Sequence, residues 1–413
     1  MKNKKVLITG ASIAGPTLAY WLHRYGFEVS VVERAAALRL GGQNIDVKGP
    51  ALEIARKMGL EEQIKAANTT EIGIRFVNTN NKLLAEFPKD SAFSMTHDLE
   101  ILRGDLVNIL YEHTQKDVLY LFNDYITQLQ ESAHDISVTF NSGKTETYDL
   151  VISAEGIGSS TRKLVFGEET EFKFLGLYTA YLTIEKASTD SRWARWCNAR
   201  GGIVYMLRPD NYGSTRASVT FLAPEKDYKA RSAEEQKQVL IERMRGTGWE
   251  SDRLINEITR TQDLYFDKVS QVKSPRWSKG RVALIGDAAY CATPIAGKGT
   301  DLAMSGAYIL AGELSIAKTY QEAFDSYEKK MRPYVEKSQK LPPGVPRIVY
   351  PTSLLGLFLL NSLFTVVGSS PVKWVTGLLS KGKKKEEVDI DLPDYSLINS
   401  NRFPKNKADY KTD

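Results

Sequence analysis

The fold is decided near the start of the chain by KVLITGASIAG, the stretch from Lys5 to Gly15. Its first five residues are apolar and β-rich, its last six form a turn bounded by glycines, and Pro16–Tyr25 follows with helical spacing. Apolar residues then alternate through Glu28–Val32, which is typical of a second strand. A strand, a helix and a strand in this order form a βαβ unit, which predicts a parallel sheet covered by helices.

The turn of this unit has the chemistry of a nucleotide-phosphate site. Gly10 and Gly15 permit a tight turn and close packing of strand on helix, and Ser12 stands in the place of a middle glycine. The following helix offers free N–H groups to a pyrophosphate, and Glu33 can accept hydrogen bonds from a ribose. The alternative is a tight turn in another α/β protein, but an acidic residue about twenty positions further on argues against it.

A second stretch of this character is RVALIGDAA, residues 281–289. It predicts a buried strand that brings Asp287 to its carboxyl end, where the carboxylate can bind hydroxyl groups. A glycine-rich turn follows and aims the helix expected at Leu302–Leu314 toward the same place, so that a helix N-terminus can stabilise negative charge there. The alternative is a strand that ends in a capping aspartate.

Strand and helix signals elsewhere divide the chain into two units. Residues 171–267 are richer in aromatic and β-forming residues, and the nucleotide-domain pattern resumes at Gly280–Asp287. We therefore predict an α/β fold: a Rossmann-type nucleotide-binding domain, an inserted β-sheet substrate domain and a C-terminal helical segment. The predicted boundaries are 1–75, 98–170 and 268–330 for the nucleotide-binding domain, 76–97 and 171–267 for the substrate domain, 331–395 for the helical segment and 396–413 for a flexible tail.

An apolar run, Ser353–Gly368, stands near the C-terminus and is followed by the basic stretch Lys381–Lys385. The run has Asn361 and Ser362 at its middle and is shorter than the ~18 apolar residues of a spanning helix. We expect a helix over Leu354–Val367 that is buried or interfacial and packs across the domain junction.

Composition narrows the possible partners and the location. The 413 residues include 55 basic and 50 acidic side chains without a long basic stretch interleaved with aromatics, so nucleic acid is not expected as a partner. Cys197 and Cys291 are too few for a disulfide framework, and the first strand begins within five residues of Met1, which leaves no room for a signal peptide. We expect a cytoplasmic protein.

Residues that usually perform catalysis or bind metals form no cluster in the sequence. The four histidines are scattered without paired spacing, and the two cysteines indicate neither a zinc site nor a thiol nucleophile. We therefore expect no metal site and no catalytic side chain, which fits an enzyme whose cofactor performs the chemistry.

Three separated motifs together resemble a known family. They are the GASIAG turn with Glu33, the segment EGIGSSTR at Glu155–Arg162, and GDAA with the later proline and GKG around Asp287. In this order and spacing they are similar to the single-component, FAD-dependent aromatic hydroxylases related to para-hydroxybenzoate hydroxylase, over roughly the first three quarters of the chain. The resemblance implies that the first motif binds the ADP half of FAD, that the second lies near the pyrophosphate and NADPH, and that the third binds the ribityl and pyrophosphate portion.

Within this family the chain most resembles the tetracycline-inactivating monooxygenases. The stretches that carry this likeness are Tyr20–Phe27, Gly41–Gly49, Arg103–Leu106 and Gly286–Leu314. The likeness implies that Arg103 contacts FAD and that the Gly42–Asp46 loop lies along the flavin. The alternatives are a surface ion pair for Arg103 and an ordinary turn carboxylate for Asp46. The implied FAD-binding residues are Gly10, Ser12, Ala14, Gly15, Glu33, Arg34, Gly42, Asp46, Arg103, Asp287, Pro294, Gly297, Gly299, Thr300 and Asp301, and the implied NADPH-linked residues are Glu155, Gly156 and Arg162.

Two residues depart from the family pattern. Glu155 stands where the second motif usually begins with Asp, which puts its NADPH-linked role in question, and Asp301 stands where the third motif usually has Asn. Asp301 is either a helix cap or, if it lies beside the flavin, a negative charge that disfavours the anionic reduced form.

The resemblance implies a monooxygenase in which NADPH reduces FAD and one oxygen atom of O2 is added to a small aromatic or polycyclic substrate, with tetracycline-like molecules the first to test. Aromatic residues that could line a sheet above the flavin are Tyr178, Tyr181, Trp193, Trp196, Tyr205 and Phe221. The alternatives are a flavin-dependent reductase or dehydrogenase and a non-catalytic protein that binds FAD and a ligand. The expected partners are the substrate and O2, in a monomer or small homo-oligomer without a membrane span, and weak association with a membrane surface stays open.

Overall fold

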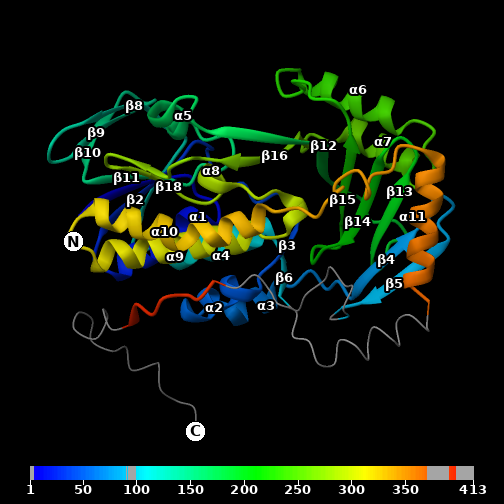
Figure 1. Cartoon of the computed structure of the whole chain (residues 1–413), viewed down its shortest axis with the longest axis horizontal. Coiled ribbons are helices and arrows are strands. Elements are labelled where there is room, and N and C mark those ends of the chain that lie inside the picture. The colour runs from blue at the N-terminus through cyan, green and yellow to red at the C-terminus, as the bar shows by residue number, and fades with distance from the viewer. Residues whose placement is uncertain (1–3, 90, 92–98, 370–389, 397–413) are drawn as a thin grey trace, which may run out of the picture.

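The computed structural model describes residues 4–89, 91, 99–369 and 390–396. Two large sheets lie at opposite ends of the molecule, and most helices pack against the first of them (Figure 1). The predicted α/β class is confirmed.

The first sheet contains the βαβ unit expected from the sequence. Its six strands lie in the order β17-β18-β11-β1-β2-β7, and every neighbouring pair is parallel except β17 and β18. A sheet of this kind places the carboxyl ends of β1 and β18 along the same edge. The strands are β1 (Lys5–Thr9), β2 (Glu28–Glu33), β7 (Leu119–Phe122), β11 (Leu150–Ser153), β17 (Ser278–Lys279) and β18 (Val282–Leu284).

Two different layers cover this sheet. Val6 and Ile8 of β1 pack in a core with helices, whereas Leu7 points the other way and packs with residues of a small antiparallel sheet. That sheet consists of β8 (Ile126–Glu131), β9 (Ile136–Phe140) and β10 (Thr145–Tyr148). The helices around the first sheet are α1 (Ala14–Arg24), α2 (Gly49–Lys57), α3 (Glu61–Ala66), α4 (Arg103–Thr114), α5 (Ser160–Phe166), α8 (Asp287–Tyr290), α9 (Gly299–Ile316) and α10 (Tyr320–Gln339).

The second sheet has seven strands in the order β16-β12-β15-β14-β13-β4-β5, antiparallel except for the pair β13 and β4. Helices α6 (Ala233–Met244) and α7 (Ser251–Arg260) pack on one face, which we call the core face. Buried and half-buried residues alternate along β15 because successive side chains point to opposite faces. We call the other side the open face. The strands are β4 (Gly73–Val77), β5 (Leu83–Pro88), β12 (Glu171–Ile184), β13 (Ala194–Ala199), β14 (Ile203–Pro209), β15 (Thr215–Leu222) and β16 (Tyr265–Lys273).

Short segments join the two sheets. β3 (Asn44–Asp46) pairs with β6 (Glu100–Leu102) between them. At the end of α10 the side-chain amide of Gln339 donates to the carbonyls of Val272 and Cys291, at 2.8 and 3.1 Å. The predicted domain boundaries stay a prediction, but β4 begins at Gly73 and β16 ends at Lys273, so strand pairing extends the second sheet a few residues beyond 76–97 and 171–267.

Helix α11 (Leu354–Val367) has the predicted bounds but not the predicted position. It lies against β5 at the outer end of the second sheet, far from the first sheet, so the expected packing across the junction is wrong (Figure 1). Only Leu360 of this helix is buried. The periodicity of the run indicated a helix but contained no information about which surface would receive it.

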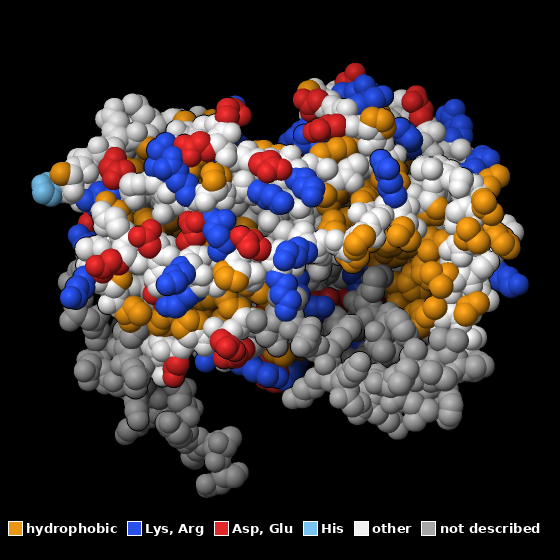
Figure 2. All heavy atoms as spheres, in the orientation of Figure 1, with side chains coloured by type: hydrophobic (Ala, Val, Ile, Leu, Met, Phe, Trp, Pro, Cys, Tyr) orange, Lys and Arg blue, Asp and Glu red, His pale blue; other side chains and the backbone are white. Residues whose placement is uncertain are grey.

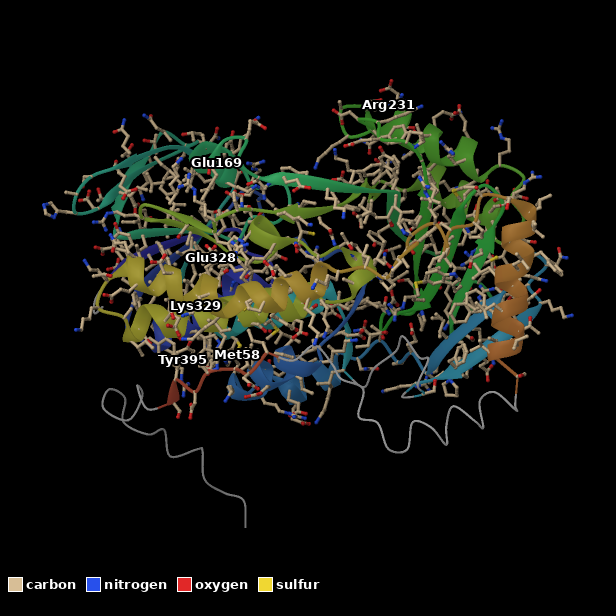
Figure 3. The ribbon with its side chains drawn as sticks, viewed as in Figure 1. Met58, Glu169, Arg231, Glu328, Lys329 and Tyr395 are labelled. Carbon is tan, nitrogen blue, oxygen red and sulfur yellow. The ribbon has the colours of Figure 1, made fainter. Side chains whose placement is uncertain are left out.

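Residues 390–396 return to the helices of the first sheet. Tyr395, labelled in Figure 3, lies beneath α9, where its hydroxyl donates to the carboxylate of Glu313. A Cβ on Gly312 would come within 2.2 Å of the Tyr395 ring, so the glycine makes room for the ring. Tyr395 therefore fixes the C-terminal segment to α9.

Candidate cofactor site

The glycine turn after β1 brings strand and helix unusually close. A Cβ on Gly15 would lie 2.0 Å from the carbonyl oxygen of Gly10, which only glycine avoids. Ile13, which precedes α1, provides no side-chain cap, so the first N–H groups of the helix are left for another acceptor. This is the arrangement that binds a pyrophosphate.

Glu33 is fixed at the end of β2 by two backbone amides. Its carboxylate accepts from the N–H of Ala11 at 2.9 Å and from the N–H of Ala35 at 3.0 Å. Arg39 approaches the same carboxylate to 3.8 Å. Glu33 is therefore held at the turn by hydrogen bonds, and its carboxylate oxygens can also accept from ribose hydroxyls.

A pocket of about 260 Å³ opens where this turn meets α4. Its lining residues are Ala11, Ser12, Glu33, Leu38, Arg39, Arg103 and Val107. An uncapped helix N-terminus, two guanidinium groups and one carboxylate suit a phosphate and a ribose, so these residues fit the ADP half of FAD. No motif in the sequence indicated Leu38, Arg39 or Val107, because the first two lie in a loop and Val107 is one of several buried apolar residues of α4.

Arg103 begins α4 and binds the loop before β3. Its guanidinium donates to the hydroxyl of Ser12 at 3.1 Å and to the carbonyl of Gly41 at 2.7 Å. Burial lowers the pKa of this guanidinium from its ordinary value. A Cβ on Gly42, whose φ is +139°, would come within 2.7 Å of the Arg103 Nε. These bonds to a hydroxyl and a carbonyl differ from the surface ion pair that was the alternative, and the FAD contact itself stays a prediction.

The loop that contains Gly42 continues into β3 and reaches the second sheet. Gln43 donates to the carbonyl of Ala217 at 3.4 Å, and Asn44 donates to the carbonyl of Pro209 at 3.2 Å. Asp46 is half-buried and pairs with Lys48 at 3.6 Å. The loop expected to lie along a flavin therefore borders the open face of the second sheet.

The third motif forms one exposed surface at the carboxyl end of β18. Asp287 begins α8 immediately after Gly286, and its side chain is accessible to solvent. Desolvation of the carboxylate by the surrounding protein raises the pKa of its carboxyl, and a hydrogen bond with Cys291 opposes the increase. Pro294, Gly297 and Gly299 are also exposed, whereas Thr300 is buried at the start of α9. α9 has no side-chain cap, so its N-terminus offers N–H groups beside a hydroxyl-binding carboxylate, which fits the ribityl and pyrophosphate portion of FAD.

Asp301 points away from this surface. Its carboxylate accepts from the N–H of Ala51 at 3.0 Å, from the hydroxyl of Tyr334 at 2.6 Å and from Lys298 at 3.1 Å. Thus it joins α9 to α2 and α10, with its charge balanced by Lys298. It does not cap its own helix, and the expectation that it places an uncompensated negative charge beside a flavin is not supported.

The second motif is held by internal hydrogen bonds. Glu155 accepts from the hydroxyl of Ser159 at 2.7 Å and from the N–H and hydroxyl of Thr161 at 2.9 and 2.8 Å. Gly156 precedes this turn with φ +78°. Ser160 accepts from Arg34 at 2.8 Å, which ties the motif to the end of β2. The longer Glu155 side chain is thus accommodated as part of the start of α5.

Arg162 connects the second motif to the third. Its side chain is buried and donates to the carbonyls of Ile157 and Ala288, at 2.6 and 2.7 Å. Burial lowers the pKa of its guanidinium, and the charge of Glu155 opposes the decrease. Its NADPH-linked role stays a prediction, and the geometry adds a role in positioning the residue next to Asp287.

The aromatic residues expected to line one face of the second sheet are divided between its two faces. Tyr178, Tyr205 and Phe221 lie in the core face with α6 and α7, which corrects that expectation for them. Tyr181 and Trp196 lie on the open face, while Trp193 precedes β13 and lies under Arg75. Successive side chains of a strand point to opposite faces, so aromatic residues that were grouped only by type lie on different faces of the sheet.

The open face is where the two sheets meet. Ile295 of the third motif packs with Trp196, Leu177 and Tyr350 on this face. Thr179, Tyr181 and Thr183 of β12 pair with polar residues of β15, namely Thr220, Ser218 and Arg216. Hydroxyl groups and a guanidinium therefore stand beside the candidate cofactor site.

A buried ionic cluster also lies at this junction and was missed by the sequence analysis. Arg208 of β14 pairs with Glu71 at 2.8 Å and with Glu100 of β6. Burial raises the pKa of the Glu100 carboxyl to about 7, with Glu71 adding to the increase and Arg208 opposing it. Arg208 and its partners are more than one hundred positions apart in sequence, so no local pattern could have indicated the cluster.

Comparison with known proteins gives the family. The family described as "FAD binding domain" matches residues 3–340. A flavin-dependent monooxygenase of Legionella longbeachae serogroup 1 (strain NSW150) is 40% identical over 343 residues, which cover 82% of this chain and 88% of that protein. The crystal structures of the tetracycline destructases Tet(51) and Tet(55) are each 34% identical, with a TM-score of 0.79, and cover 96% of this chain and all of theirs.

The family match covers most of the chain, and the relatives match along nearly their whole length. The chain therefore belongs to the FAD-binding family and, within it, to the flavin-dependent monooxygenases. The resemblance to FAD-dependent hydroxylases and tetracycline-inactivating enzymes that the sequence indicated is confirmed.

Proposed function

We propose that this member of the FAD-binding family uses NADPH and O2 to add one oxygen atom to a flat, aromatic or polycyclic substrate of the tetracycline type. The chemistry that FAD supplies in such an enzyme is acceptance of hydride and activation of O2. The residues that would hold it are those of the first and third motifs together with Arg103 and the Gly42–Asp46 loop. The observation that carries the proposal is that both of these FAD-side elements border the open face of the second sheet.

The composition of the open face supports a polar polycyclic substrate. Tyr181 stacks on Tyr265 with ring centroids 5.8 Å apart, which provides flat apolar surface. Arg216 donates to Asp210 at 3.0 Å and to Thr183 at 2.7 Å, so its guanidinium is held in a fixed direction. A ring system that carries several hydroxyl or carbonyl oxygens matches aromatic rings beside hydroxyl and guanidinium donors. The similarity to tetracycline destructases over nearly the whole chain supports the same class.

The proposal is tested with the FAD-loaded protein. NADPH oxidation is followed with tetracyclines, rifamycins and simple phenols, and products are analysed by mass spectrometry. We expect a tetracycline to accelerate NADPH oxidation and to yield a product heavier by one oxygen atom. Failure of all three classes to do either would reject the substrate class.

The two alternatives give different results in the same assay. A reductase would oxidise NADPH and release an equal amount of peroxide with every compound, and a non-catalytic protein would bind a ligand without reduction by NADPH. The ion pair of Asp301 with Lys298 and the hydrogen bonds that hold Glu155 at the start of α5 favour an active enzyme, because both departures from the family pattern have partners within the protein.

A pair of variants examines the substrate surface. Arg216→Met removes a guanidinium from the open face, and Arg231→Met removes one from an exposed position before α6, labelled in Figure 3. We expect the first to raise the KM for a tetracycline by about tenfold, the effect of losing one charge-assisted hydrogen bond, and the second to leave it unchanged. Equal KM values in both variants would exclude Arg216 from substrate binding.

We also infer from the sequence a cytoplasmic location and a monomer or small homo-oligomer. Among the described residues, no helix has the length and apolar character needed to cross a bilayer. Size-exclusion chromatography with light scattering tests the oligomeric state, and cell fractionation tests the location.

A further inference from the structure

Helix α11 presents a continuous apolar surface to solvent. Its fourteen residues include no charged side chain, and six large apolar ones are each more than half exposed. These six, which we call the α11 apolar face, are Leu354 (73%), Leu355 (68%), Phe358 (66%), Leu359 (58%), Leu363 (54%) and Val366 (57%). Figure 2 shows hydrophobic side chains gathered over this end of the molecule. Large apolar faces of this kind usually have a partner.

The opposite side of α11 accounts for its attachment to the protein. Leu360 is buried, and the ring of Phe364 stacks on Phe76 of β4 with centroids 4.3 Å apart. Ser362 and Thr365 donate to carbonyls of the same helix, at 2.8 and 2.9 Å, so these hydroxyls do not require water. The helix is therefore docked along one side and can place the other in a nonaqueous environment.

The length of α11 excludes one kind of membrane contact. A helix of 14 residues is about 21 Å long, which is too short for the hydrocarbon core of a bilayer, about 30 Å thick. Contact with a bilayer would therefore run along its surface and not across it.

Charge in the neighbouring sequence indicates the partner. Arg347 and Ile348, which precede α11, are both exposed, with Ile348 at 60%. The sequence KGKKK at residues 381–385, which lies outside the described residues, adds four lysines within twenty residues of the end of the helix. An apolar helix face flanked by basic residues is characteristic of binding to anionic lipid surfaces.

We propose that the α11 apolar face docks the protein on the surface of a bilayer that contains anionic lipid. The helix would lie in the plane of the interface with its six apolar side chains among the acyl chains, and the exposed Arg347 before it would lie near the headgroups. The opposite side of α11 packs through Phe364 on the cluster around Phe76 at the outer end of the open face, to which Trp196 also contributes, whereas the α11 apolar face is exposed. The proposal does not depend on the proposed reaction.

The test is co-sedimentation of the full chain, loaded with FAD, with vesicles of phosphatidylcholine containing about 30% phosphatidylglycerol. The Leu355→Ser/Leu359→Ser variant removes two side chains of the face. The control is Leu119→Ser/Leu164→Ser, which removes two leucines of similar exposure, 56% and 51%, from β7 and α5. FAD content and thermal unfolding show whether each variant remains folded.

We expect the wild type and the control to bind, and the α11 variant to bind at least about tenfold more weakly, because membrane affinity follows the buried apolar area. Pure phosphatidylcholine or a high salt concentration should weaken wild-type binding, since both reduce the attraction of lysine to lipid. Absence of wild-type binding, or equal binding by the α11 variant, would overturn the proposal. So would a wild-type dimer, detected by analytical ultracentrifugation without lipid, that the α11 variant converts to a monomer.

Discussion

Replacing Asp287 by Ala is expected to weaken FAD binding by about tenfold to a hundredfold. The carboxylate is exposed at the carboxyl end of β18, between the start of α8 and the uncapped start of α9. Its loss therefore changes the fold little, and the effect should fall on the ligand. A hydrogen bond to a charged group contributes about 1.5–3 kcal/mol, and about 1.4 kcal/mol corresponds to tenfold in affinity.

The affinity is measured by titrating FAD into apoprotein and following flavin fluorescence. Asp325→Ala is the matched control, because Asp325 is an exposed carboxylate on α10. A dissociation constant for Asp287→Ala within about twofold of the wild-type value would refute this assignment of the third motif.

Three further changes test other parts of the structure. Gly15→Ala should lower the free energy of unfolding in urea by about 1–3 kcal/mol, because its Cβ would overlap the Gly10 carbonyl, whereas Gly158→Ala, with open space around its Cβ, should have little effect. Arg162→Ala should slow flavin reduction by NADPH in stopped-flow absorbance more than it lowers FAD affinity; equal losses would instead assign Arg162 to positioning through Ala288. Glu100 has a folded-state pKa near 7, above its ordinary value of 4.5, so its contribution to stability is present below about pH 4.5 and is lost as the pH rises through about 7. Glu100→Gln should remove this part of the pH dependence of thermal unfolding, and an unchanged profile would assign the dependence to other groups.

The sequence was informative where chemistry and local structure depend on neighbours in the chain. The turn from Gly10 to Gly15 and the strand that precedes Asp287 were predicted from a few consecutive residues, because each needs only a tight turn and an adjoining helix. The bounds of α11 were predicted in the same way from Leu354–Val367. In each case the residues that form the sequence pattern are close neighbours in the chain, and the same residues form the structural element.

The sequence was less informative where a side chain depends on a distant partner. Tyr178 and Tyr181 stand three positions apart but point to opposite faces, and register in the sheet determines which of them can meet a ligand. Arg208 meets Glu71 and Glu100 only because β14 passes beside β6 at the junction. The location of α11 depends on the surface formed by Phe76 and β5, which no feature of the helix itself specifies.

The path of the chain between the two sheets limits how they can move. The chain leaves the first sheet for the second after α3, after α5 and after α10, and it returns after β5, after β16 and after α11. Opening about a hinge requires a few flexible linkers on one side, whereas crossings distributed along a junction permit only small sliding displacements. Relative motion of the sheets should therefore be a shear of small amplitude, and an interdomain distance measured by paired spin labels should change little when ligand binds.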